Sequence, residues 1–199
     1  MITASGVELR VGARLLLEPT TFRIASGDRV GLVGRNGAGK TTLTKALAGE
    51  TQPTSGTISR GEVGYLPQDP ASGDLTQLAM DRVLSARGLD AVLTAMRETE
   101  GAMASADDAT RDKAMDRYTR LEARFTAAGG YAAESEAHRI TAALGLDDRV
   151  LGQELGTLSG GQRRRVELAR ILFSGADTLL LDEPTNHLDA DSKIGRAHV

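Results

Sequence analysis

The sequence predicts an α/β fold in which a glycine-rich loop follows a strand of a parallel sheet and a long helical section interrupts the strands. Three observations predict it. A glycine-rich run at residues 34–41 lies between a short apolar run and a stretch with apolar residues at helical spacing. A second short apolar run, residues 178–181, ends in two carboxylates, as a buried parallel strand can. Most of the sequence between residues 68 and 158 has helical periodicity instead.

The start of the chain reads as short strands joined by turns, which predicts an antiparallel β section. Turns are expected at residues 5–6, 12–13 and 26–28, where glycine stands beside serine or alanine. Residues 29–33 follow, and they are expected to form a buried parallel strand because the run is apolar and directly precedes the glycine-rich run.

The glycine-rich run, Gly-Arg-Asn-Gly-Ala-Gly-Lys-Thr, has the composition of a loop that binds nucleotide phosphates. Its glycines allow positive φ angles and bring backbone N–H groups close to phosphate oxygens. Lys40 neutralises the charge of the β- and γ-phosphates, and Thr41 offers its hydroxyl to Mg²⁺. The residues expected to bind the nucleotide are Gly34, Arg35, Asn36, Gly37, Ala38, Gly39, Lys40, Thr41 and Thr42. A turn without chemical function is the alternative, but the helix expected from here to Gly49 favours the binding loop.

Two further strands are expected at residues 57–59 and 63–66, and the second delivers Gln68 at its end. Helical periodicity then continues almost to Leu158. The sequence therefore predicts an inserted helical subdomain over about residues 75–155.

Within that subdomain we expect an antiparallel helical hairpin with its turn near Asp107. Asp107 or Asp108 is expected to cap the second helix. The inward positions are predicted to be Leu89, Val92, Leu93, Met96 and Met103 in the first helix and Met115, Tyr118, Leu121 and Phe125 in the second. The hairpin is expected to end at residues 129–130 and a third helix to span residues 135–144. Basic and acidic residues nearly balance in the hairpin, which predicts no basic arm.

A second anion-binding helix start is expected at Ser159, Gly160 and Gly161, which precede Gln162. The helix itself is predicted at residues 163–173. Its core-facing residues are expected to be Val166, Leu168, Ala169, Leu172 and Phe173. The arginines at 163–165 are expected on a solvated face, in preference to nucleic-acid contact.

Residues 178–184 read as a fully buried strand that ends in two carboxylates. Ligands of parallel sheets collect at the carboxyl ends of strands. Asp182 is therefore expected to hold Mg²⁺ through its water shell, and Glu183 to polarise the water that attacks the γ-phosphorus. Pro184 cannot continue the ladder, so the chain is expected to turn and free Glu183. A solvated turn is the alternative.

Four segments together resemble the Walker A, Q-loop, signature and Walker B motifs of ATP-binding cassette (ABC) ATPases: residues 34–41, Gln68, residues 158–162 and residues 179–183. The resemblance implies a P-loop NTPase cassette with an antiparallel β subdomain and an inserted helical subdomain. It also implies that two cassettes pair head to tail around ATP. Lys40, Thr41, Gln68, Asp182 and Glu183 would then serve one ATP with its Mg²⁺, Gln68 in a catalytic and metal-binding role. Ser159, Gly160, Gly161 and Gln162 would cap the other ATP.

Asn186 and His187 resemble the corresponding residues of ABC-F proteins, which are tandem-cassette ATPases that act on ribosomes as translation or antibiotic-resistance factors. The long helical insertion points the same way. The resemblance implies a ribosome partner and a second cassette in the same full-length chain. The alternative functions are the ATP-binding subunit of a membrane transporter and a DNA-repair or chromosome-organising ATPase.

The sequence departs from the family pattern in three respects. Val11 stands where an aromatic ring often stacks on adenine, so base stacking is expected to be weaker. The histidine switch expected after Glu183 is absent, and so is a second cassette. Residues 193–199 resemble a translated sequencing adapter, so the cassette is expected to span residues 1–192 and the tail to be non-native.

Composition agrees with one such cassette. In 199 residues, 40% apolar content is enough for a sizeable core. A net charge of −3 gives no global attraction for nucleic acids, and 3% aromatic residues leave few stacking platforms. The lack of cysteine excludes disulfides and thiolate metal sites. No membrane-spanning run or signal-peptide pattern is visible, so a cytoplasmic protein is expected.

Overall fold

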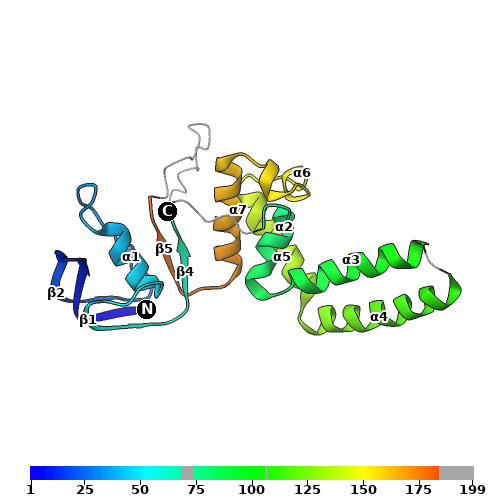
Figure 1. Cartoon of the computed structure of the whole chain (residues 1–199), viewed down its shortest axis with the longest axis horizontal. Coiled ribbons are helices and arrows are strands. Elements are labelled where there is room, and N and C mark those ends of the chain that lie inside the picture. The colour runs from blue at the N-terminus through cyan, green and yellow to red at the C-terminus, as the bar shows by residue number, and fades with distance from the viewer. Residues whose placement is uncertain (69–73, 106, 184–199) are drawn as a thin grey trace. The chain divides into compact units, whose positions relative to one another are not determined.

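The computed structural model of the protein describes residues 1–68, 74–105 and 107–183 (Figure 1). These residues form two compact units. Residues 1–68 and 175–183 make up the first unit, which contains all the strands and one helix. Residues 74–174 make up the second unit, which is helical. The mixture of parallel and antiparallel strands with helices agrees with the predicted α/β class.

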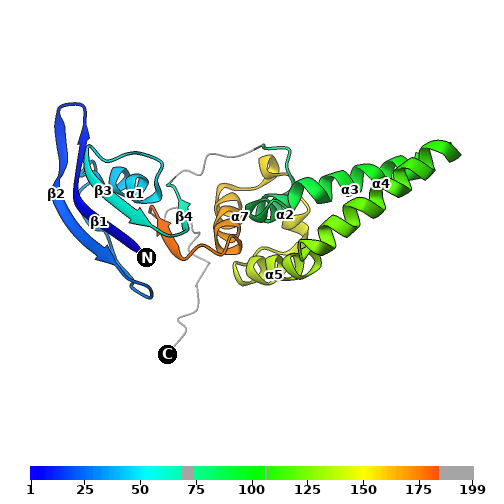
Figure 2. The same ribbon diagram turned by 90° about the horizontal axis from the view of Figure 1, so that it is seen from below.

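An antiparallel sheet of three strands begins the first unit. Its strands are β1 (Ile2–Val11), β2 (Arg14–Ile24) and β3 (Ser55–Arg60), and β1 lies between the other two (Figure 2). Apolar residues at alternating positions of β1 are buried, namely Ile2, Ala4, Val7 and Leu9. Three of them, Ala4, Val7 and Leu9, share a core cluster with Ala46 of helix α1 (Lys40–Ala48). The predicted antiparallel β section is therefore present.

The turn predicted at residues 5–6 is wrong. Both residues lie inside β1, where the register with β2 shifts between Ala4 and Val7. Gly6 adopts a φ of 58° at this irregularity, and its N–H donates to the Thr21 hydroxyl at 2.9 Å. Glycine marks a bulge here, because a strand can take up an extra residue without ending. The turns predicted at residues 12–13 and 26–28 are confirmed, the second as a turn at residues 26–27.

A parallel pair of strands forms the other sheet of this unit. It joins β4 (Val63–Leu66) to β5 (Thr178–Leu181), and the N–H of Asp182 extends the ladder by donating to the Leu66 carbonyl at 2.9 Å. Both carboxyl ends therefore lie at the same edge of the sheet. The prediction of a fully buried strand is wrong for β5, because Leu179 and Leu181 are 39% and 40% exposed.

Residues 29–33 do not form the predicted buried strand. They have no regular structure, and Val30, Leu32 and Val33 are 67%, 49% and 90% exposed. A strand needs a neighbouring ladder, and among the described residues the only parallel ladder is that between β4 and β5. The helix after the loop is confirmed as α1, which ends at Gly49 in the left-handed conformation, φ 86°.

The second unit packs several helices around one apolar core. They are α2 (Ala79–Leu84), α3 (Asp90–Ser105), α4 (Asp108–Ala127), α5 (Gly130–Ala143), α6 (Asp148–Leu151) and α7 (Gly160–Phe173), with 3₁₀ turns at Ser85–Arg87 and Leu155–Thr157. Phe125, Val166 and Phe173 are fully buried in this core. The predicted inserted helical region is thus a compact body with a core of its own.

Helices α3 and α4 form the predicted hairpin and lie side by side in both views (Figures 1 and 2). Asp107 caps α4, since its carboxylate accepts a hydrogen bond from the Thr110 N–H at 2.8 Å, which also lowers the pKa of Asp107. The inward position predicted for Met115 is wrong, because Met115 is 60% exposed and Ala114 is buried instead. Met115 lies too far around the helix from Phe125 to share its face.

Helix α5 begins at Gly130, five residues before the predicted start. Gly129 precedes it with a φ of 69°, so the chain turns sharply out of α4. A Cβ on Gly130 would stand 2.4 Å from the Phe125 ring, which itself contacts the Tyr131 ring edge-on at 5.2 Å. Gly129 therefore allows the sharp turn, and Gly130 allows the close approach of the Phe125 ring.

The arginines of α7 do not lie on a solvated face as predicted. Arg164 is only 3% exposed, and the Arg165 guanidinium donates to the carbonyls of Leu144 and Gly145 at 3.3 and 3.2 Å. Helix α7 contacts both α2 and α5. Because neighbours cover more than one side of α7, consecutive residues on it are partly or fully buried.

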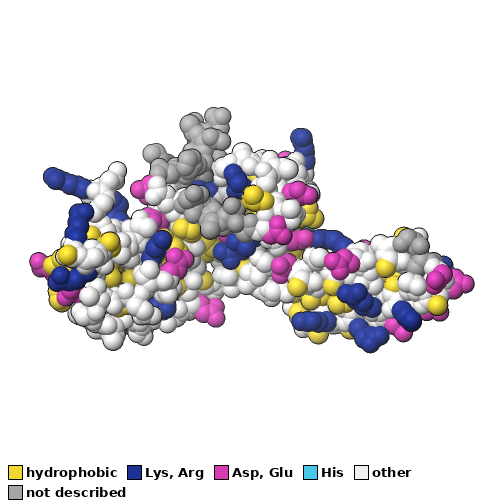
Figure 3. All heavy atoms as spheres, viewed as in Figure 1, with side chains coloured by type: hydrophobic (Ala, Val, Ile, Leu, Met, Phe, Trp, Pro, Cys, Tyr) yellow, Lys and Arg dark blue, Asp and Glu magenta, His cyan; other side chains and the backbone are white. Residues whose placement is uncertain are grey.

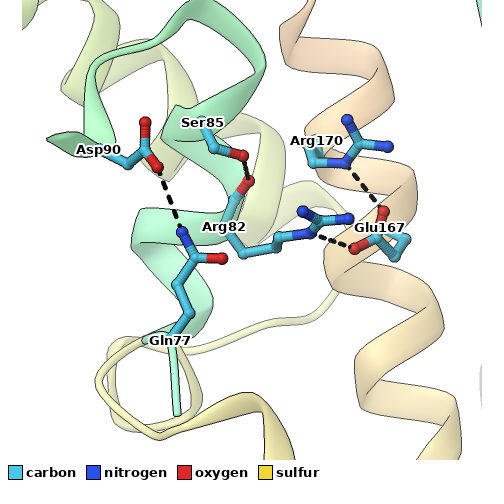
Figure 4. Close-up of polar contacts among 6 residues, drawn as sticks. All are labelled: Gln77, Arg82, Ser85, Asp90, Glu167 and Arg170. Atoms are coloured by element: carbon cyan, nitrogen blue, oxygen red, sulfur yellow. Dashed lines mark hydrogen bonds and ion pairs between the residues drawn. The ribbon is translucent and has the colours of Figure 1, made fainter. Parts of the chain in front are cut away.

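A buried carboxylate links α7 to α2. Glu167 is 6% exposed, and its two oxygens accept from Arg82 Nε at 2.5 Å and Arg170 Nε at 2.8 Å (Figure 4). The Ser85 hydroxyl donates to the Arg82 carbonyl at 2.7 Å in the same group of contacts. The pairing of both oxygens makes burial of the Glu167 charge tolerable.

The other end of α7 is held by Arg87. Its Nε donates to the Phe173 carbonyl at 2.7 Å, and its guanidinium carbon lies 4.0 Å from the centre of the Phe173 ring. The same guanidinium makes two bonds to Glu136, at 2.8 and 3.0 Å, which lowers the pKa of Glu136. One side chain thus joins α5 to the last turn of α7.

We expect Arg82→Ala to lower the free energy of unfolding by about 3 kcal/mol, because it leaves a buried carboxylate with only one of its two partners. Urea denaturation of the whole chain, followed by circular dichroism, measures this. Arg111→Ala is the matched control, since it breaks an exposed ion pair with Asp108 on α4 and should leave the midpoint nearly unchanged. Equal losses in the two variants would contradict the role of Glu167.

Candidate functional site

The glycine-rich loop presents free N–H groups at the start of α1. Gly37 and Gly39 have φ angles of 74° and 95°, and Gly39 is the residue before the first helical residue, Lys40. No side chain caps this helix start, so its first N–H groups are available to an anion. A Cβ on Gly39 would also stand 3.1 Å from Leu16 Cβ. Both the angle and the contact therefore require glycine at this position.

A cavity of about 420 Å³ lies against the loop, a volume that suits a small-molecule ligand. Its lining residues are Val11, Arg14, Leu16, Asn36, Gly37, Gly39, Lys40, Thr41, Thr42, Gln68 and Glu183. Most of the predicted phosphate-binding residues are among them, together with Gln68 and Glu183 from the carboxyl edge of the parallel strands. Gly34, Arg35 and Ala38 belong to the loop but do not line the cavity.

The Lys40 side chain is hydrogen-bonded across the glycine-rich loop. Its ammonium donates to the carbonyls of Gly34 at 2.8 Å and Arg35 at 3.1 Å. These contacts hold the positive charge of Lys40 at the N-terminal part of the loop. Thr41, the next residue, is exposed and lines the cavity.

Arg14 is a site residue that the sequence reasoning missed. It begins β2, lines the cavity, and its Nη2 donates to the Gly37 carbonyl at 3.3 Å. The sequence contains a signal for it, since Arg14 stands three residues after Val11, the residue expected beside the adenine base. Val11 is 59% exposed and also lines the cavity. This wall therefore combines an aliphatic surface with a guanidinium, in place of an aromatic ring.

The carboxylates at the end of β5 have different surroundings. Asp182 is 5% exposed, whereas Glu183 is half-buried and lines the cavity. Glu183 has a φ of 49°, a left-handed conformation that costs a residue with a Cβ about 1 kcal/mol. The backbone thus turns immediately after the strand, as predicted, although Pro184 lies outside the described residues. Strain of this kind is often found at functional positions.

Tyr65 on β4 is an ionisable residue whose pKa responds to the charge of Asp182. Burial, followed by the charges of Asp182 and Glu50, raises the pKa of Tyr65 to about 12. The phenol therefore stays neutral at physiological pH. Its hydroxyl is buried and makes no hydrogen bond within the described part of the chain.

The donor atoms near the cavity fit Mg²⁺. Thr41 and Gln68 line the cavity and offer a hydroxyl and an amide oxygen. Asp182 offers a carboxylate and directly precedes Glu183, but it does not itself line the cavity. Mg²⁺ prefers such hard oxygen ligands together with water and phosphate. Fewer protein carboxylates are needed when phosphates supply the rest. The described ranges contain no cluster of three or more histidine, cysteine or acidic residues that could hold a metal ion.

The predicted second anion site belongs to the helical unit. Ser159 caps α7: its hydroxyl accepts from the Gln162 N–H at 3.2 Å, and its own N–H donates to Gln162 Oε1 at 2.9 Å. A Cβ on Gly160 would meet open space, so the helix start is accessible. The helix begins at Gly160, three residues before the predicted start at 163. Asn186, His187 and residues 193–199 lie outside the described residues.

Comparison with known proteins identifies relatives along nearly the whole chain. A family model described as ABC transporter matches residues 17–186. The tylosin resistance ATP-binding protein TlrC of Streptomyces fradiae is 40% identical, and the alignment covers 94% of this chain and 35% of that protein. The energy-dependent translational throttle protein EttA of Haemophilus influenzae is 35% identical, with 90% and 32% covered. The chain thus spans about a third of the length of these curated relatives.

Solved structures share the fold at lower identity. A structure of an ATP-binding subunit of an ABC transporter has a TM-score of 0.66 at 21% identity and covers 96% of this chain and 69% of its own. The ATP-binding cassette MJ0796, in a dimeric post-hydrolysis state bound to ADP and Pi, has a TM-score of 0.61 at 19% identity and covers 96% and 77%. None of the helices in residues 1–68, 74–105 and 107–183 has the length and apolarity to cross a membrane.

We expect Gly39→Ala to weaken the binding of a fluorescent ATP analogue by at least about tenfold, because the added methyl strains a left-handed backbone and presses on Leu16. Fluorescence titration of the whole chain measures the affinity. Gly31→Ala is the control, since a Cβ at Gly31 meets open space and its φ is not positive. If both variants bind as tightly as the unaltered chain, the loop is not the nucleotide site.

Proposed function

The chain belongs to the ABC transporter family of ATP-binding cassettes, and we propose that it is the cassette of an ABC-F type protein that acts on ribosomes. In this proposal the first unit binds Mg²⁺-ATP, and hydrolysis follows when a second cassette completes the site. The observation that carries the ATP-binding part of the proposal is a single cavity lined by Lys40, Thr41, Gln68 and Glu183. A phosphate loop and a strand-end carboxylate on one cavity are what ATP hydrolysis requires.

The loop binds the polyphosphate through backbone N–H groups at the start of α1, and the Lys40 ammonium exchanges its two carbonyl partners for phosphate oxygens. Thr41, Gln68 and Asp182 would hold Mg²⁺, which offsets negative charge on the phosphates. Glu183 orients a water for in-line attack on the γ-phosphorus and accepts its proton as the bond to the β-phosphate oxygen breaks. ADP and phosphate are the products.

The residues proposed to serve a second cassette are those of the signature segment, residues 158–162. Ser159 and Gln162 hydrogen-bond to one another through side chain and backbone. The N–H groups of Gly160 and Gly161 take no part in these two bonds and are available to contact an anion. None of these residues lines the cavity of the first unit. We propose that they cap an ATP bound to the partner cassette, and that the partner caps the ATP of this one. The chain alone then binds ATP and barely hydrolyses it.

Two observations support the ABC-F assignment, namely the names of two relatives and the length of the helical insertion. The names of TlrC and EttA refer to antibiotic resistance and to translation. The α3–α4 hairpin supplies the long insertion on which the resemblance also depends. The second candidate is an ATP-binding subunit of a membrane transporter. The similar structure of an ATP-binding subunit of an ABC transporter favours it, but that protein is only 21% identical to this chain, so it supports the fold alone.

Glu183→Gln is expected to preserve ATP affinity and to lower turnover by at least about 100-fold in the full-length protein, because the amide cannot accept the proton of the attacking water. Phosphate release measures turnover, and a fluorescent ATP analogue measures affinity. Glu154→Gln, in the helical unit, is a control for loss of one carboxylate and should hydrolyse ATP normally. Turnover by Glu183→Gln at the unaltered rate would remove Glu183 from the mechanism.

Ribosome action is tested by sedimentation. The full-length Glu183→Gln protein should accumulate in the ribosome pellet when ATP is present, because it keeps ATP bound without hydrolysing it. Lys40→Ala should bind ATP more weakly and stay in the supernatant, since the phosphate charge is no longer neutralised. If the Glu183→Gln protein is absent from the pellet while it binds ATP normally, the ABC-F proposal fails and the transporter alternative gains support.

A further inference from the structure

The glycine-rich loop contains an asparagine that is followed directly by a glycine, Asn36-Gly37. Asparagine is one of the thermolabile residues, because its side-chain amide can be lost without an enzyme. The loss begins when the backbone nitrogen of the next residue attacks the carbon of that amide. Glycine in the next position leaves the nitrogen unshielded, since it has no Cβ. A reactive pair of residues therefore lies inside the loop of the candidate site.

Asn36 and Gly37 are the central residues of an exposed turn. The Ala38 N–H donates to the Arg35 carbonyl at 3.1 Å and closes the turn, and Gly37 has a φ of 74°, as a type II turn requires at this position. All four residues are exposed and precede the first residue of α1. The backbone of the pair is therefore not fixed by a helix or by a strand ladder.

The two groups that must react carry no hydrogen bond. Within residues 1–68, 74–105 and 107–183, neither the Gly37 N–H nor the Asn36 side-chain amide has a partner. A Cβ built on Gly37 would have no atom within 4 Å, so the backbone here can rotate without meeting a neighbour. No existing bond has to be broken before the nitrogen can attack, which lowers the barrier to the reaction.

Two cations contact the backbone of this turn. Arg14 Nη2 donates to the Gly37 carbonyl at 3.3 Å, and the Lys40 ammonium donates to the Arg35 carbonyl at 3.1 Å. Basic side chains, dark blue in Figure 3, gather at the end of the first unit where Figure 1 shows the loop before α1. The attacking nitrogen must lose its proton, and nearby positive charge stabilises the anion that forms. Charges that suit a bound phosphate therefore also favour attack by Gly37 when no phosphate is present.

We propose that Asn36 is a site of spontaneous deamidation and that a bound nucleotide protects it, so that a vacant cassette loses its phosphate loop with time. The Gly37 nitrogen gives up its proton and bonds to Asn36 Cγ, and the Cγ–Nδ2 bond breaks. Nδ2 leaves as ammonia together with that proton, and a cyclic imide remains. Water then opens the ring at either of its carbonyl carbons, so residue 36 becomes aspartate or isoaspartate. Nothing is oxidised or reduced.

Either product alters the cavity, because Asn36 and Gly37 both line it. Each product adds a negative charge to the wall that the phosphates would contact, and like charges repel. Isoaspartate also inserts a carbon atom into the backbone between the two residues, so the N–H groups of the loop no longer converge on one anion. Deamidation therefore weakens ATP binding.

The protection rests on the proposed ATP site, but the reactivity of Asn36 does not. A phosphate that accepts hydrogen bonds from the N–H groups of the loop fixes the loop backbone. The Gly37 nitrogen then cannot turn toward the Asn36 side chain. Only the vacant fraction of the protein reacts, so a nucleotide concentration of about 100 times the dissociation constant should slow the conversion by about 100-fold.

The test follows residue 36 in the whole chain over several days at physiological temperature and pH, with or without Mg²⁺ and adenylyl-imidodiphosphate, which resists hydrolysis. Mass spectrometry of peptides measures the conversion of amide to acid, and oxygen from isotopically labelled water marks the acid formed during the incubation. Asn186 precedes His187 and is the matched control in the same sample. Without nucleotide, Asn36 should convert at least about tenfold faster than Asn186, because the Cβ of His187 shields its nitrogen.

Equal conversion of the two asparagines without nucleotide would overturn the proposal. An unchanged rate at Asn36 with saturating nucleotide would also overturn it, provided that a fluorescent ATP analogue binds normally. Lys40→Ala weakens the phosphate site, so in this variant the same nucleotide concentration should give little protection, and full protection would overturn the role of the loop. If the fresh, unaltered chain does not bind ATP and Asn36 still converts, the ATPase proposal fails and the modification site stands.

Two substitutions test the consequence for ATP binding. Asn36→Asp reproduces the charge of the product and should lower ATP affinity by at least about tenfold. Gln52→Glu is its matched control, because it also changes an amide to an acid, at an exposed position that does not line the cavity. Equal affinity in these two variants would contradict the damage to the loop.

Asn36→Gln tests whether deamidation causes the loss of affinity with time. Its longer side chain forms a less favourable ring, so this variant should keep its own initial ATP affinity through an incubation without nucleotide. The unaltered chain should lose affinity over the same period, in step with the conversion of Asn36. A parallel loss in Asn36→Gln would overturn the proposal, because another change would then be responsible.

Discussion

The candidate site depends on the pairing of β4 with β5, two strands that the whole helical unit separates in sequence. Their parallel register and the bond from the Asp182 N–H to the Leu66 carbonyl bring both carboxyl ends to one edge. Gln68 leaves one strand there and Glu183 the other. The phosphate loop supplies the remaining wall of the cavity. Without this ladder, the Glu183 carboxylate and the glycine-rich loop would have no fixed relation.

Local chemistry made much of this predictable. The phosphate loop, the helix after it, β4 and the Asp107 cap follow from glycine spacing, apolar periodicity and side-chain bonds to nearby N–H groups. Residues 29–33 are apolar enough for a buried strand, but strand formation needs a neighbouring ladder that the described residues do not supply. Burial of Arg164 and exposure of Met115 likewise depend on neighbouring helices, which periodicity within one helix does not place.

The helical unit keeps the signature segment rigid by fixing α7 at three levels. At its start, Ser159 and Gln162 form the cap. In its middle, Glu167 accepts a hydrogen bond from Arg82. At its end, Arg87 donates a hydrogen bond to the Phe173 carbonyl. A helix held in this way presents its first N–H groups in one direction, which reduces the entropy lost when an anion binds. The cap is local, and it makes the helix begin at Gly160, three residues before the start predicted from the sequence. The other two contacts join residues far apart in sequence and could not be read from it.

The charge of α4, like the burial of its residues, differs from one face of the helix to another. A count of the hairpin predicts a neutral surface, and the count is correct, yet the face of α4 that carries the exposed residues Lys113, Arg117, Arg120 and Arg124 has an excess of positive charge. The reason is that screening in water limits each charge to its neighbours within roughly 8 to 10 Å, so a polyanion responds to one face and not to the sum. Helical periodicity of charge was visible in the sequence. Its meaning required knowing which face of α4 the core leaves open, and the packing of Phe125 and Ala114 settles that.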